Sequence, residues 1–122
     1  FIMKTPVLLM QKRSTGVSRI LIIRGVFMDI VFYRSGNILV IKVSGELDHH
    51  SADIARRSMD REIMKIQTKH VLFDFSDLSF MDSSGIGLII GRYRLMQSVG
   101  GKVCAFGITH RIDKLIEMSG MN

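Results

Sequence analysis

Two adjacent hydroxyl groups, Ser83 and Ser84, directly follow the carboxylate of Asp82. The apolar run 71–75, which is typical of a strand, leads into this segment, and an amphipathic helical pattern over about 84–99 leads out of it. We therefore expect the three polar side chains at a helix N-terminus, where free backbone N–H groups and the helix dipole favour negative charge, including a phosphate. A serine there can be phosphorylated without unfolding the domain, which suits a switch.

Ordinary helix capping is the alternative interpretation, and spacing alone favours it, because Ser and Asp are common N-caps. Capping needs only one hydroxyl, however, and two are present beside Asp82. Gly85 and Gly87 are expected to leave the next turn bare, so that a partner's backbone or a nucleotide can approach closely. The segment is not a dinucleotide fingerprint, since Ile90 stands where that motif requires glycine.

A second polar segment contains Glu46 and Asp48, which flank one apolar residue just after a glycine. It is either a solvated loop with a helix N-cap or an acidic contact patch for a basic partner. His49 and His50 follow directly, and neighbouring side chains on a helix diverge by roughly 100°. The pair therefore chelates poorly, and we expect no bound metal.

Catalytic constellations are missing from the sequence. No histidine is spaced to form a triad with Ser83, and no Gly-x-Ser-x-Gly motif is present. Cys104, the only cysteine, lies in an apolar run without an adjacent His or Lys, which predicts a buried thiol rather than a nucleophile. It cannot form an intrachain disulfide. We expect a cytoplasmic protein that is not an enzyme and has no cofactor.

Charge is distributed unevenly along the chain, whose formal net charge is +6. The first 27 residues hold five basic residues and no acidic one, so residues 28–122 carry only +1. A nearly neutral domain lacks the electrostatic footprint of a nucleic-acid binder, and the absence of Trp removes one kind of base-stacking platform. We expect no direct DNA binding.

Hydrophobic periodicity predicts a single α/β domain. Strands are expected at 30–34, 38–44, 71–75 and 102–108. Helices are expected over about 84–99 and 109–118, and a further helix, capped by Asp48 or Ser51, should extend to about 66. Strands separated by helices imply crossover connections and parallel pairs. The expected architecture is therefore a four-stranded mixed sheet packed against helices.

Residues 1–27 differ from the rest of the chain. Their apolar runs, 7–10 and 20–23, are too short to span a bilayer, and no signal-peptide cleavage site follows. Arg24-Gly25-Val26 matches the translation of a purine-rich ribosome-binding sequence just upstream of Met28. We expect residues 1–27 to be a non-native or upstream-translated extension and 28–122 to be the domain. The alternative is a basic amphipathic extension that contacts anionic membrane.

Several motifs of residues 28–122 together resemble the sporulation anti-sigma F factor antagonists, each a single STAS domain. They are Gly45–Ala52 (GELDHHSA), Asp77–Leu88 (DLSFMDSSGIGL), Gly91–Arg94 (GRYR) and Met118–Gly120 (MSG). The resemblance implies a STAS-type fold. Family members continue with a further strand and a C-terminal helix, so we expect the domain to be C-terminally truncated at Asn122, with an exposed sheet edge.

The resemblance also implies a mechanism. The unphosphorylated antagonist binds a dimeric anti-sigma factor that is also a serine kinase, and this releases the sporulation sigma factor. The kinase then phosphorylates Ser83, and a membrane-bound serine phosphatase removes the phosphate. The antagonist itself is expected to be a monomer when free and not to bind membrane.

Because the phosphate acts at the partner surface, we expect a set of neighbouring residues to form that surface. They are Glu46, Asp48, Asp82, Ser83, Ser84, Gly85 and Ile86. Two alternatives remain open: a STAS module of a stress-response partner-switching system, and a domain that binds or hydrolyses a nucleotide.

Overall fold

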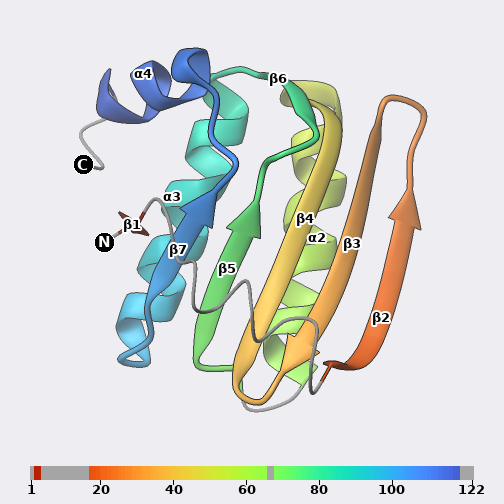
Figure 1. Cartoon of the computed structure of the whole chain (residues 1–122), viewed down its shortest axis with the longest axis vertical. Coiled ribbons are helices and arrows are strands. Elements are labelled where there is room, and N and C mark those ends of the chain that lie inside the picture. Colours follow the sequence, from red (N-terminus) through yellow and green to blue (C-terminus); the bar gives the residue numbers. More distant parts are fainter. Residues whose placement is uncertain (1, 4–16, 66–67, 119–122) are drawn as a thin grey trace.

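A seven-stranded sheet forms the centre of the computed structural model, which describes residues 2–3, 17–65 and 68–118 (Figure 1). The strands are β1 (Ile2–Met3), β2 (Val17–Arg24), β3 (Met28–Ser35), β4 (Ile38–Leu47), β5 (His70–Asp74), β6 (Leu78–Met81) and β7 (Val103–Phe106). The helices of the described residues are α2 (His49–Lys65), α3 (Ser83–Ser98) and α4 (His110–Met118). The sheet order is β1-β7-β5-β4-β3-β2, and β6 pairs with β4 outside this path.

The sheet is mixed. β3 pairs antiparallel with β2 and with β4, whereas β5 pairs parallel with both β4 and β7. The tight turn between β3 and β4 contains Gly36, whose φ of 59° lies in the left-handed region that glycine adopts without strain. The parallel pairs need crossover connections, which α2 and α3 supply.

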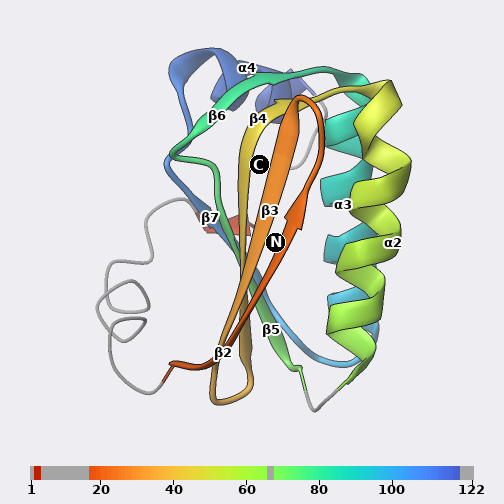
Figure 2. The ribbon, with the colours of Figure 1, turned by 90° about the vertical axis from the view of Figure 1, so that its right-hand side faces the viewer.

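Helices α2 and α3 cover the same face of the sheet (Figure 2). Ala55, Met59 and Ile63 recur at helical spacing on α2, and all three are buried. In β3, buried and partly exposed residues alternate, so Ile30 and Phe32 point to the core. These side chains join the residues of the central strands in one apolar cluster between the sheet and the helices.

The prediction of an α/β domain with a mixed sheet is confirmed, and each of the four expected strands is present. The expected number of strands was wrong, because the sheet also includes β1, β2 and β6. β6 is only four residues long, too short for periodicity to identify it. The burial of Cys104 is also confirmed.

Strands β1 and β2 lie in the segment expected to be an extension. β2 pairs with β3 from Asp29 to Ser35, and Leu21 and Ile23 pack against the main core. Loss of residues 1–27 from the mature protein stays a prediction. The edge of β7, expected to be unpaired, is paired over two residues with β1.

No helix within the described ranges is both long enough and apolar enough to cross a membrane. Helix α2 begins at His49, directly after Asp48, which is one of the two N-caps that the sequence left open. Its predicted end at Ile66 lies outside the described residues. Helix α3 begins at Ser83, one residue before its expected start.

Candidate functional site

The N-termini of α2 and α3 lie next to each other because the strands before them are paired. β6 runs parallel to the last residues of β4, with Glu46 opposite Phe80 and Leu47 opposite Met81. One residue follows each strand before its helix begins, and the Asp82 N–H donates to the Leu47 carbonyl at 3.3 Å. The two polar segments singled out in the sequence therefore meet at one end of the sheet.

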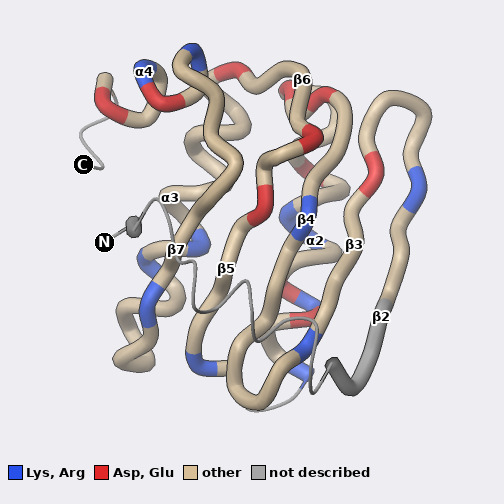
Figure 3. Tube along the Cα trace, in the orientation of Figure 1, with Lys and Arg blue, Asp and Glu red and all other residues tan. Residues whose placement is uncertain are grey.

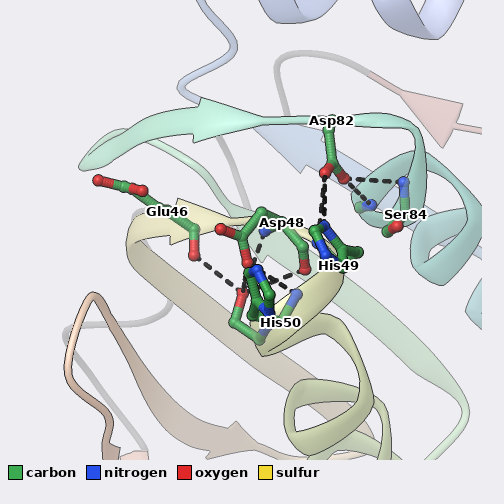
Figure 4. A network of polar contacts seen from close by, with 8 residues as sticks. Glu46, Asp48, His49, His50, Asp82 and Ser84 are labelled. Atoms are coloured by element: carbon green, nitrogen blue, oxygen red, sulfur yellow. Dashed lines mark hydrogen bonds and ion pairs between the residues drawn. The ribbon is translucent and has the colours of Figure 1, made fainter.

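Asp82 connects the two helices with a single carboxylate (Figure 4). Its Oδ1 accepts hydrogen bonds from the N–H groups of Ser84 (2.8 Å) and Gly85 (3.4 Å), which makes it the N-cap of α3. Its Oδ2 accepts from the N–H of His49 (3.2 Å), the first residue of α2, and lies 4.0 Å from the Nδ1 of the same histidine. Backbone donors of both helix ends are thus satisfied by one side chain.

Asp48 is the N-cap of α2. Its Oδ1 accepts from the N–H groups of His50 (3.0 Å) and Ser51 (3.1 Å). The Ser51 hydroxyl accepts from the Asp48 N–H (3.1 Å) and donates to the Glu46 carbonyl (3.0 Å). These hydrogen bonds lower the pKa of Asp48, and the one from the Ser51 N–H contributes most, so this half-buried carboxylate is ionised at neutral pH.

The two serines of the motif have different surroundings. Ser83 is the first residue of α3 and is exposed, whereas Ser84 is half-buried and lines a shallow groove between α2 and α3. Both lie at the end of α3 that favours negative charge. A phosphoryl donor arriving from solvent can therefore reach the hydroxyl of Ser83 more easily than that of Ser84.

The other residues expected at the partner surface differ in exposure. Glu46 is exposed, and Asp48 and Asp82 are half-buried. Gly85 and Ile86 are buried, so neither offers a side chain to a partner in this structure. A Cβ on Gly85 would lie 2.5 Å from the Met81 Cγ and 3.1 Å from the Leu47 carbonyl oxygen.

The expectation that glycines leave this turn bare therefore holds for only one of the two. Gly85 is needed for close packing against β4 and β6. Gly87 is exposed, and nothing lies within 4 Å of a Cβ built there.

Acidic residues gather at this end of the sheet (Figure 3). Not all of them carry free negative charge, because Asp77 forms an ion pair with Lys42 at 2.9 Å and its hydrogen bond raises the pKa of that lysine. Asp74 is buried and accepts hydrogen bonds from the N–H and the hydroxyl of Ser76. Asp82 directly precedes Ser83, and Glu46 and Asp48 lie at the end of the paired strand β4 and at the start of α2. We call Glu46 and Asp48 the acidic rim.

No cluster of three or more His, Cys, Asp or Glu side chains suited to a metal ion is found among the residues the structure describes. The rings of His49 and His50 lie 3.8 Å apart between centroids, tilted by 39°. The backbone N–H and the ring of His49 both face Asp82, a contact that the sequence did not predict because 33 residues separate His49 from Asp82.

The STAS domain model matches residues 29–122, so this chain belongs to the STAS domain family.

Within that class, the chain is similar to anti-sigma factor antagonists. It is 40% identical to the anti-sigma F factor antagonist of Paenibacillus polymyxa over 84 residues, which cover 69% of this chain and 72% of that protein. The solved structure of the anti-sigma factor antagonist SpoIIAA in its unphosphorylated form superimposes with a TM-score of 0.62 at 27% identity, covering 82% of this chain and 83% of that one. The solved structure of the Bacillus cell fate determinant SpoIIAA in the phosphorylated form superimposes with a TM-score of 0.62 at 29% identity, covering 84% of this chain and 85% of that one.

Proposed function

We propose that this chain is an anti-sigma factor antagonist that is switched off by phosphorylation of Ser83. Its unphosphorylated form binds an anti-sigma factor that is also a serine kinase, and binding releases the sporulation sigma factor. The observation that carries the proposal is the exposed Ser83 hydroxyl at the first position of α3, beside Asp82 and the acidic rim. Its support from outside the structure is the similarity to a protein named as an anti-sigma F factor antagonist.

The phosphate is expected to change binding rather than folding. A phosphoserine carries about −1.5 to −2 charges. At the N-terminus of α3 this charge is favourable by roughly 0.3–1 kcal/mol, because the first N–H groups and the helix dipole attract it. The domain should therefore keep its fold when Ser83 is modified.

In the complex with the kinase, the phosphate is expected to be unfavourable. The Ser83 hydroxyl must then face the phosphates of the kinase's nucleotide and the acidic groups that hold its metal and its proton acceptor. A phosphate left on Ser83 meets like charge there and also fills space that the hydroxyl did not. Like-charge juxtaposition at an interface costs several kcal/mol, and each 1.4 kcal/mol weakens affinity about tenfold.

In this proposal the chain is a substrate and not a catalyst. Asp82, the carboxylate next to Ser83 in sequence, uses both oxygens to accept backbone N–H groups, so it is poorly placed to deprotonate the hydroxyl. The base and the nucleotide come from the kinase, and a serine phosphatase reverses the modification.

Phosphosite mapping tests the proposal. The chain is incubated with the cognate anti-sigma kinase and Mg-ATP, and modified residues are identified by mass spectrometry. We expect phosphate on Ser83 of the wild type, none on Ser83→Ala, and normal modification of the matched control Ser84→Ala. Phosphate accepted by Ser83→Ala would refute the site, and nucleotide hydrolysis by the chain without any kinase would refute its role as a passive substrate.

A further inference from the structure

A second surface feature adjoins the acidic rim. A groove of about 390 Å³ lies between the loop that joins β2 to β3 and the first turns of α2. Its walls are largely apolar, and three side chains in it are unusually exposed for their type: Val26 by 89%, Phe27 by 70% and Ile54 by 52%. Contiguous exposed apolar side chains of this kind mark interaction sites more often than chance. We call this feature the apolar groove.

The fold holds the apolar groove and the acidic rim together. The Glu46 N–H donates to the Phe27 carbonyl at 2.8 Å, which ties the β2–β3 loop to the end of β4. Gly45 permits this contact, because its φ is 88° and a Cβ there would overlap the Phe27 carbonyl oxygen. Glu46 and Asp48 consequently line the groove as well as flanking the site of Ser83.

The charged side chains that line the groove limit the kind of partner that can bind there. Two carboxylates, Glu46 and Asp48, one guanidinium, Arg24, and the imidazole of His50 line it, so its formal charge, with histidine counted as neutral, is negative. A second copy of this chain docking by two-fold symmetry would place the acidic rim against itself, which like-charge repulsion disfavours. An anionic lipid surface is disfavoured for the same reason. A segment with an apolar side chain next to a basic one satisfies both the walls and the rim.

We propose that the apolar groove is a second docking surface for the anti-sigma factor and accepts an apolar side chain from a basic segment of that partner. This inference rests on the proposed function. It also requires that residues 23–27, which form one wall of the groove, belong to the functional protein, so it runs against the prediction that residues 1–27 are lost. It extends the interface from Ser83 across the acidic rim to Ile54. Ser83 then carries the signal, while the groove contributes affinity that does not depend on the hydroxyl itself.

The test measures binding of the full chain to the purified cognate anti-sigma factor by titration calorimetry. Ile54→Ala removes an apolar wall of the groove and should weaken affinity about tenfold. Met64→Ala is the matched control, because Met64 lies on the same helix, is 79% exposed and does not line the groove. Neither change should alter thermal unfolding much, since both replace exposed residues of α2 with the best helix former.

Glu46→Gln tests the rim separately, and should slow association several-fold at low salt with a smaller effect at high salt. Ile54→Ala binding as tightly as wild type would overturn the inference while leaving the Ser83 switch intact. No binding by the wild type would instead overturn the proposed function and this inference with it. Sedimentation and flotation with phosphatidylglycerol vesicles complete the test: an Ile54-dependent self-association or vesicle binding, in place of partner binding, would also overturn it.

Discussion

Asp82 is expected to be the residue on which both helix N-termini depend, and its replacement by alanine makes the sharpest prediction about stability. The change removes the N-cap of α3, which is worth about 1 kcal/mol, and the acceptor for the His49 N–H, which is worth about 1 kcal/mol more. Asp82→Ala should therefore lower the free energy of unfolding by about 2 kcal/mol. For a domain of this size that corresponds to a fall in Tm of roughly 6–12 °C.

Asp82→Asn separates the two contributions. Its amide oxygen can still cap α3, but its NH₂ group cannot accept from the His49 N–H. Urea unfolding should then rank wild type above Asp82→Asn and Asp82→Asn above Asp82→Ala, with steps of about 1 kcal/mol each.

Hydrogen exchange supplies the local readout. Asp82→Ala should speed exchange of the first amides of both α2 and α3, whereas Asp48→Ala should affect α2 alone, because Asp48 caps only that helix. Equal stability of Asp82→Ala and wild type, or faster exchange in α3 only, would refute the argument that one carboxylate holds both helices.

Three further predictions concern separate parts of the molecule. Gly45→Ala should lower the free energy of unfolding in urea by at least about 1–2 kcal/mol, because the φ of Gly45 is 88° and a Cβ there would overlap the Phe27 carbonyl oxygen. Gly87→Ala, in open space on α3, should be neutral or stabilising, and a Gly45→Ala variant more stable than Gly87→Ala would contradict the backbone argument. Burial lowers the pKa of His70, and the charges of Lys69 and Lys102 lower it further, so the contribution of neutral His70 to stability is present above pH 6.5 and is lost as pH falls through the lowered folded-state pKa. His70→Asn should therefore make the free energy of unfolding less dependent on pH between 7 and 5, and an unchanged pH dependence would count against the argument. Ser83→Asp should bind the anti-sigma factor at least tenfold more weakly in calorimetry while keeping the wild-type Tm, and wild-type affinity would argue against a charge-based switch.

Features that depend on residues close together in the chain could be predicted from the sequence. The alternating run at 38–44, the continuous apolar run at 71–75 and the helical stripe through Ala55, Met59 and Ile63 each reflect how one element is buried, so the pattern alone predicts them. The capping role of Asp82 was equally accessible, because an N-cap and the amides it accepts are within three residues of each other.

Contacts between distant segments required the tertiary structure. The parallel pairing of β6 with the end of β4 brings Asp82 to His49, and no local pattern specifies that register. The same pairing buries Gly85 and Ile86, which the sequence placed at an exposed turn. Likewise, Ile54 is apolar and sits on a helix with a clear core stripe, yet it is 52% exposed and faces the apolar groove.

The amino-acid sequence by itself therefore determined four of the strands, the three helices of the described residues, and the helix N-terminus that carries Ser83 with acidic residues near it. Only the tertiary structure decided which hydroxyl is exposed, which glycine is structural and that an apolar groove adjoins the acidic rim. The physical reason is that periodicity and capping act over a few residues, whereas exposure and the shape of a surface depend on how β4, β6 and the β2–β3 loop meet across long stretches of chain.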